Sequence, residues 1–406
     1  MPLIRPFAGL RPAKGRSADV IAPPYDVLDC DEARARAQGR PWSFLHISRA
    51  EIDLPEGTDP YDPAVYQKAA ANLQHMLDAG VLRRDDKPCY YVYRLVMGTH
   101  MQTGLVAAAS VHEYDSNRIR RHEFTRPDKE DDRVRQIEAL NAQTGPVLLA
   151  YRSRPEIDGL LESATGEEPD CEVVADDGIA HSLWVIRDTG LIDVFSAAFE
   201  TMDALYIADG HHRSAAASRV AAARAAMDDN AGYFLAVVFP HSQLRILDYN
   251  RVVRDLNGMT PETFLAGLTD RFTVAPVASA CHPQGPGEFG MYLGGQWFRL
   301  GIRPERVPDD PVGCLDVSLL AENLLAPVLG ITDPRSDRRI DFVGGIRGLV
   351  ELEGRVDSGK MQVAFSMYPT RMEDLMAVAD AGGVMPPKST WFEPKLADGL
   401  VSHMLD

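Results

Sequence analysis

Five consecutive residues, Asp209-Gly210-His211-His212-Arg213, combine side chains that move protons, hold metal ions and bind phosphate. Arginine offers a fixed fork of donors that matches phosphate oxygens, while aspartate and histidine exchange protons or act as metal ligands. Glycine permits a tight turn among them. The stretch therefore predicts phosphate chemistry, with Asp209, His211 and His212 as catalytic candidates, Gly210, His212 and Arg213 as phosphate ligands, and Asp209 as a metal ligand.

The flanking residues indicate how this stretch is positioned. Residues 204–208 form a short apolar run typical of a buried strand, and the alanine-rich residues 214–227 favour a helix. A helix start carries unpaired amides and partial positive charge, which suit a phosphate. A strand–turn–helix is common in any α/β protein, and one histidine could simply satisfy a buried carbonyl. Four polar side chains on one turn are harder to explain by packing.

A second candidate comprises His122, Glu123, Thr125 and Arg126, directly before a predicted helix that has Pro127 in its first turn. Acidic residues suit such a helix start, so a solvated helix end explains the segment as well as a pocket does. Both interpretations stay open. As a pocket, it would supply Glu123 for catalysis and His122, Thr125 and Arg126 for substrate binding.

A third candidate, Lys388-Ser389-Thr390, follows two prolines that restrict the backbone. A lysine followed by hydroxyl groups matches the chemistry of phosphate loops, but the glycines of a Walker A loop are missing. Alone the pattern is weak. Together with the 209–213 stretch it predicts a contribution to phosphate binding.

Composition narrows the class of protein. A chain of 406 residues exceeds one typical core, and its formal net charge of −17 disfavours a protein whose main partner is a nucleic-acid backbone. The five scattered cysteines form no Cys-x-x-Cys pair, as expected in a reducing cytoplasm. We see neither a signal peptide nor an apolar stretch near the ~20 residues of a membrane span. A cytoplasmic protein without a membrane partner is expected.

Periodicity predicts a mixture of strands and helices without strict βαβ alternation, so the fold class is α+β, or mixed α/β. A division into 1–258 and 259–406 is expected, the second region carrying Lys388. That region could close over the site or form a homodimer interface, and both remain open. The expected strands are 42–47, 89–96, 104–114, 147–151, 181–188, 232–239, 245–253, 272–277, 341–344 and 361–367, and the expected helices 63–79, 194–202, 261–268, 315–329, 346–352 and 372–381.

Several segments together resemble a widespread prokaryotic family of long-unknown function, and the likeness runs nearly end to end. The segments are 4–7, 22–27, 43–46, 51–55, 122–125, 209–213 and 385–390. The family is similar to the ParB/sulfiredoxin-like superfamily, in which free serine kinases carry the same Asp-Gly-His-His-Arg turn and phosphorylate L-serine. The resemblance implies a ParB/sulfiredoxin-like nucleotide-binding core with additional α/β regions.

The resemblance also implies roles for individual residues. Gly210, His212 and Arg213 would hold phosphate, Asp209 would lie near the transferred group or the serine hydroxyl, and Glu123 would be the positional candidate for the catalytic base. The chain is longer than a minimal serine kinase, and its Lys388 motif belongs to the larger family. No helix-turn-helix of the kind that partition proteins use on DNA is visible.

The leading hypothesis is a kinase that uses Mg²⁺ and either ATP or ADP to phosphorylate free L-serine. The alternative is a nucleotide-binding regulatory module of the ParB-like type, which would bind nucleotide without metabolite turnover. A third hypothesis, metal-dependent phosphohydrolysis by the paired histidines, is disfavoured because no further spaced ligands are visible near them.

Overall fold

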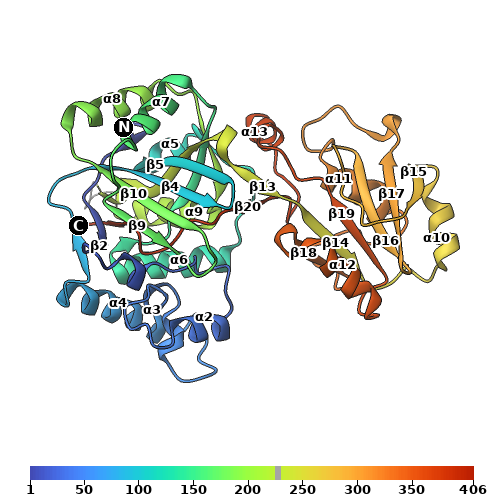
Figure 1. The fold of residues 1–406 in the computed structure, drawn as a ribbon, viewed down its shortest axis with the longest axis horizontal. Coiled ribbons are helices and arrows are strands. Elements are labelled where there is room, and N and C mark those ends of the chain that lie inside the picture. The colour runs from blue at the N-terminus through green and yellow to red at the C-terminus, as the bar shows by residue number, and fades with distance from the viewer. Residues whose placement is uncertain (225–229) are drawn as a thin grey trace. The chain divides into compact units, whose positions relative to one another are not determined.

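The computed structural model describes residues 1–224 and 230–406, and it divides into two compact units. One unit comprises Met1–Leu244 together with Pro394–Asp406, and the other comprises Arg245–Glu393 (Figure 1). These ranges differ from the expected regions 1–258 and 259–406, because the final segment of the chain returns to the first unit. The last three residues of the expected helix 214–227 lie outside the described residues.

The first unit contains a large mixed sheet, for which the described residues supply nine strands. Its order is β6-β11-β8-β12-β5-β4-β10-β9, with β1 added beside β5, and the pairs β6/β11 and β8/β12 are parallel. The strands are Ile4–Arg5 (β1), Tyr90–Met97 (β4), His100–Ser110 (β5), Ile119–Arg120 (β6), Val147–Tyr151 (β8), Cys171–Val174 (β9), Ala180–Ile186 (β10), Leu205–Asp209 (β11) and Tyr233–Pro240 (β12).

A smaller sheet brings the end of the chain into the first unit. Within the described residues its order is β3-β2-β21-β7, so the C-terminal strand β21 lies between two strands that precede it by most of the chain. Figure 1 shows this red segment running among blue and green elements. The strands are Gly9–Pro12 (β2), Leu82–Arg84 (β3), Ala142–Gln143 (β7) and Ser402–Met404 (β21).

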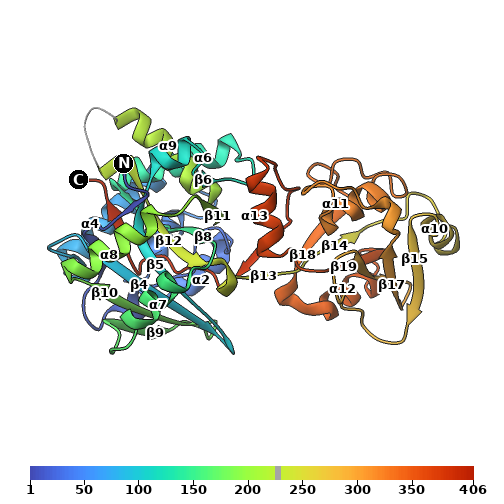
Figure 2. The ribbon, with the colours of Figure 1, turned by 90° about the horizontal axis from the view of Figure 1, so that it is seen from above.

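Helices pack on the sheets of the first unit, and α6 and α9 lie side by side (Figure 2). Helix α4 begins as its sequence predicts, since Asp62 caps it through the N–H of Ala64 and Pro63 occupies the first turn. The helical segments are Ser17–Val20 (α1), Cys30–Ala37 (α2), Leu45–Ser48 (α3), Ala50–Asp53 (η1), Pro63–Asp78 (α4), Val111–Asp115 (α5), Pro127–Leu140 (α6), Pro155–Ala164 (α7), Thr189–Glu200 (α8), His211–Arg224 (α9), Asn230–Gly232 (η2) and His241–Gln243 (η3).

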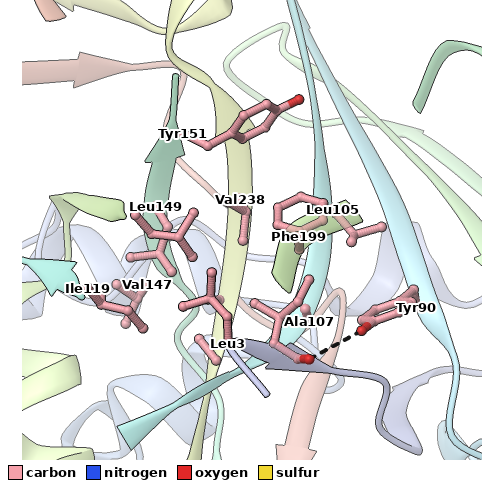
Figure 3. Packing of buried hydrophobic residues seen from close by; sticks show 14 of the residues in the cluster. Leu3, Tyr90, Leu105, Ala107, Ile119, Val147, Leu149, Tyr151, Phe199 and Val238 are labelled. Carbon is pink, nitrogen blue, oxygen red and sulfur yellow. Dashed lines mark hydrogen bonds between the residues drawn. The ribbon is translucent and has the colours of Figure 1, made fainter. Parts of the chain in front are cut away.

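The hydrophobic core of the first unit lies against the large sheet. Figure 3 shows Leu149 and Val238 from neighbouring strands packed near Leu105 and Phe199, all of them fully buried. Every residue of β12 is buried, which explains its continuous apolar sequence, because a central strand covered on both faces does not alternate. This rigid sheet holds β11 and the start of α9 in place.

The second unit is built on an antiparallel sheet of order β15-β17-β16-β19-β14-β18 within residues 245–393. The first and last strands of the unit, β13 and β20, pair antiparallel with each other. The strands are Arg245–Leu247 (β13), Tyr249–Val253 (β14), Phe272–Val277 (β15), Glu288–Leu293 (β16), Gln296–Ile302 (β17), Ile340–Gly344 (β18), Val363–Met367 (β19) and Trp391–Glu393 (β20). The helical segments are Pro261–Leu268 (α10), Pro304–Arg306 (η4), Asp316–Leu320 (α11), Ala321–Leu325 (η5, π-helical), Gly345–Arg347 (η6), Gly348–Asp357 (α12) and Met372–Asp380 (α13).

The mixed α/β class expected from the sequence is confirmed, with three local corrections. The expected strand 104–114 ends at Ser110, because Val111–Asp115 forms α5. The expected strand 42–47 is wrong, because Leu45–Ser48 is helical and packs its apolar residues near α4. A short apolar run fits a buried helix as well as a strand, so periodicity does not separate them. The expected helix 315–329 is α-helical only over Asp316–Leu320 and then widens into a π-helical turn. No helix among the described residues is both long and apolar enough to cross a membrane.

Candidate active site

The candidate site begins where β11 ends and α9 starts. Asp209 is the last strand residue, Gly210 alone makes the turn, and His211 opens the helix. Gly210 has a φ of 97°, and a Cβ atom there would lie 3.3 Å from the Cα of Val147. A larger residue would therefore be strained as well as crowded. Glycine lets the carboxylate of Asp209 lie beside the helix amino end, where partial positive charge favours anions.

Asp209 forms an ion pair with Lys395, whose Nζ lies 3.0 Å from its Oδ2. Burial alone would raise the pKa of Asp209, but the positive charges of Lys395 and Arg213 outweigh it and hold that pKa well below its usual range. The carboxylate is therefore ionised near neutral pH. Lys395 belongs to the C-terminal segment of the first unit, and the sequence analysis did not select it.

Arg213 is almost buried beside this pair, with 10% of its side chain exposed. Its guanidinium donates to the carbonyl of Pro146 and to Oδ2 of Asp26, the latter at 3.3 Å. Burial opposes its charge, yet Asp26 and Asp209 raise the pKa of Arg213 above its ordinary value. The cation is thus fixed on the first turn of α9, as phosphate binding requires.

A small cavity lies next to Arg213, lined in part by Tyr25, Arg133 and Asp398. Arg133 stacks over the ring of Tyr25 at 3.8 Å from its centroid. Asp398 is only 2% exposed, and burial raises its pKa to about 7, although the charge of Arg213 opposes the shift. Two arginines therefore line this cavity together with a carboxyl that burial makes easier to protonate. Neither Arg133 nor Asp398 was predicted as a site residue.

A cluster of two histidines and a glutamate lies next to the turn: His122, Glu123 and His211. Because β6 runs parallel to β11, the residues that follow the two strands lie at the same edge of the sheet. The rings of the two histidines are 4.4 Å apart and nearly perpendicular. Glu123 places its Oε2 3.8 Å from Nδ1 of His211. Both histidines are buried, at 2% and 4% exposure, whereas the side chain of Glu123 is 49% exposed.

The remaining predicted substrate-binding residues also lie beside α9. The N–H of Arg126 donates to Nε2 of His212 at 3.1 Å, which ties the loop before α6 to the first turn of α9. Thr125 donates through its hydroxyl to Glu130. The guanidinium of Arg126 is exposed and ion-paired with Asp128 at 2.8 Å. The structure therefore brings residues 122–126 and 209–213 into one site.

Lys388, Ser389 and Thr390 belong to the second unit, whereas every other predicted site residue belongs to the first. Lys388 has a φ of 58°, an uncommon conformation for a residue with a side chain, and its carbonyl accepts from Arg251 at 3.0 Å. Ser389 is buried and donates through its hydroxyl to the carbonyl of Pro386. Its hydroxyl is thus used within the loop.

Several solved structures share a distant likeness with the chain. A free serine kinase mutant in complex with AMP is 13% identical, with a TM-score of 0.37, over 71% of this chain and 87% of the other. A conserved hypothetical protein from Pyrococcus furiosus is 14% identical, with a TM-score of 0.35, over 72% and 93%. SbnI with a C-terminal truncation from Staphylococcus aureus is 12% identical, with a TM-score of 0.39, over 72% and 85%. Likenesses at this level do not assign an activity to the chain.

A search of curated proteins found no match. A protein-family comparison matched residues 4–318, a range that contains the two first-unit segments brought together above, 122–126 and 209–213. The match covers most of the chain, and the protein therefore belongs to the family described as "Protein of unknown function (DUF1015)".

Proposed function

We propose that the protein is a kinase that transfers a phosphoryl group from ATP or ADP to the hydroxyl of free L-serine. The observation that carries this proposal is the paired charge at the start of α9, where ionised Asp209 contacts Lys395 at 3.0 Å beside buried Arg213. Phosphoryl transfer depends mainly on positioning and on neutralising phosphate charge. The charged residues on this strand–glycine–helix turn support the proposal on both counts.

The donor phosphates would lie at the amino end of α9. The N–H groups of Arg213 and Ser214 already donate to the carbonyl of Gly210, so the amides of His211 and His212 are the ones available to phosphate. Lys388, Ser389 and Thr390 are proposed as further phosphate ligands on the strength of the sequence. Mg²⁺ commonly binds one or two carboxylates together with substrate phosphates, and Asp209 supplies such a carboxylate.

Proton removal from the acceptor hydroxyl needs a carboxylate within reach. Asp209 and Glu123 are both proposed for this role: the first is ionised, and the second is exposed beside His211. His122, Thr125 and Arg126 are proposed to contact the acceptor. Serine as acceptor and the ParB/sulfiredoxin-like core rest on the resemblance of the motifs, and a cytoplasmic location on composition.

The deciding experiment is a phosphoryl-transfer assay on the full chain with Mg²⁺ and either ATP or ADP, with and without L-serine. Phosphoserine is measured by mass spectrometry. Wild type is expected to form it only when serine is present. Asp209→Asn and Arg213→Lys should lower the rate by at least about 100-fold, the range for a lost proton acceptor or a lost charge-stabilising donor.

Arg219→Lys is the matched control, since Arg219 lies on the same helix with 45% of its side chain exposed and should retain activity. Thermal unfolding must show that all variants remain folded. Nucleotide binding without phosphoserine from either donor would refute serine kinase activity and leave the regulatory module as the better explanation.

A further inference from the structure

We propose that His122, Glu123 and His211 bind a divalent transition-metal ion such as Zn²⁺. Each residue offers one ligand atom, and these three atoms lie within 4.8 Å of one another. In a tetrahedral zinc site, metal–ligand distances of about 2.0–2.2 Å place the ligand atoms roughly 3.3 Å apart. The three ligand atoms must therefore move closer together when the ion binds. This site does not depend on kinase activity.

The strongest support comes from His122. Its Nδ1 atom is buried and has no hydrogen-bond partner among the described residues. Leaving a buried polar atom unpaired costs about 1–3 kcal/mol, so such atoms are rare unless a partner is supplied from outside the chain.

His211 is the second histidine ligand, and its hydrogen bond shows which ring nitrogen carries the proton. Its Nε2 accepts the N–H of His122 at 3.5 Å, which assigns the proton of the neutral ring to Nδ1, the atom that faces Glu123. Metal binding at Nδ1 would move this proton to Nε2. Two N–H groups would then face each other, so metal binding must also separate the His122 amide from the His211 ring.

The ligand types select the metal. Two imidazoles and one carboxylate suit Zn²⁺ and neighbouring transition metals, whereas Mg²⁺ and Ca²⁺ prefer oxygen ligands. The site is thus separate in chemistry from the Mg²⁺ proposed at Asp209. Three protein ligands leave a position for water or substrate, and Glu123 lies on the exposed side of the cluster.

The test uses the full chain, freed of metal by a chelator and then titrated with Zn²⁺ in a calorimeter without nucleotide or serine. One Zn²⁺ per chain is expected, and Zn²⁺ should raise the thermal unfolding temperature because it binds the folded state. Glu123→Gln keeps the shape of an exposed side chain and should weaken Zn²⁺ binding by at least about tenfold. Glu138→Gln removes another exposed carboxylate, on α6, and should leave binding unchanged.

His122→Asn gives a second measurement, in which Co²⁺ replaces Zn²⁺ and the visible absorption of the bound ion reports its ligands. The variant should change that spectrum, while Glu138→Gln should not. Because His122 is buried, Glu123→Gln remains the deciding variant if His122→Asn does not fold. Wild-type protein that binds no stoichiometric Zn²⁺, or binds it as tightly as Glu123→Gln does, would overturn the proposal. Neither result depends on whether phosphoserine is formed.

Discussion

Lys395 reaches Asp209 across 186 positions of sequence, and their contact shows how one residue can complete a site that a motif only begins. Its ammonium is part of the charge that keeps Asp209 ionised although the carboxylate lies in a desolvated position. Both side chains remain partly exposed, at 24% and 32%. Such a pair contributes little to stability, so its main effect is expected on the chemistry of the site.

Lys395→Met should therefore separate function from folding. The substitution keeps much of the side-chain volume and removes the charge beside Asp209, so phosphoserine formation is expected to fall by at least about tenfold if about 1.4 kcal/mol of charge stabilisation is lost. The free energy of unfolding should change by about 1 kcal/mol or less. The rate is measured by mass spectrometry and the stability by denaturant unfolding. Lys360→Met, at an exposed lysine, is the control, and a wild-type rate in Lys395→Met would exclude its ammonium from the site.

At the scale of residues, the sequence predicted the types of side chain in the site better than it predicted which residues contact them. Asp209 and Arg213 can be recognised because several different polar side chains lie on one turn, and this pattern is visible in consecutive residues. Lys395 and Asp398 lack such a local signal. A single sequence also could not show that the unpaired nitrogen of His122 lies beside His211, since that contact depends on how two distant strands pair.

At the scale of elements, the strand–glycine–helix arrangement was predictable from an apolar run, a glycine and an alanine-rich segment. The structure refines it, because His211, His212 and Arg213 form the first helical turn instead of a loop. The parallel pairing of β6 with β11 was not predictable. β6 has only two residues, too few for a periodic pattern, yet it decides which segment lies next to Asp209.

Asp316, in the first turn of α11, gives a pH-dependent prediction at this scale. Its Oδ1 accepts the N–H of Gly287 at 2.7 Å, while its Oδ2 is buried without a hydrogen-bond partner among the described residues. Burial raises the pKa of Asp316 from 3.8 to about 7, against the opposing effect of the Gly287 bond. Its contribution to stability is therefore fully present below pH ~4, and it is lost as the pH rises through about 7.

Asp316→Asn removes this titration. Relative to wild type, the variant should gain on the order of 3 kcal/mol between pH ~4 and pH ~8, at about 1.4 kcal/mol per pKa unit. Denaturant unfolding across that range measures the difference, and comparing two pH values cancels any fixed cost of the new amide. Asp309→Asn, at an exposed carboxylate, should keep the wild-type profile. Parallel profiles for Asp316→Asn and wild type would show that Asp316 titrates normally.

At the scale of the whole molecule, the second unit is an insertion in the sequence of the first, because the chain returns to the first unit after Glu393. No pattern in residues 394–406 predicts that β21 pairs with β2 and β7. Such long-range pairing leaves no periodic signal in one sequence. The division into two units stays a prediction of the sequence, while the pairing of the last residues with the first unit required the structure.

The insertion predicts that the first unit can fold without the second. Arg245 and Glu393 are directly paired where β13 meets β20, so a short glycine–serine linker should replace residues 245–393 without stretching the chain. The shortened protein is expected to unfold cooperatively and to bind Zn²⁺. It should lose phosphoserine formation if Lys388 binds phosphate as proposed. Calorimetry and the mass-spectrometric assay measure these outcomes, and an unfolded product would show that the first unit depends on the second.

The return of the chain to β21 also has a consequence for protein synthesis. Asp209 leaves the ribosome long before Lys395, because the entire second unit is translated between them. A nascent chain that stops anywhere in that unit has neither its central β21 strand nor the cation beside Asp209. The ion pair between Asp209 and Lys395 can therefore form only after the whole second unit has been translated.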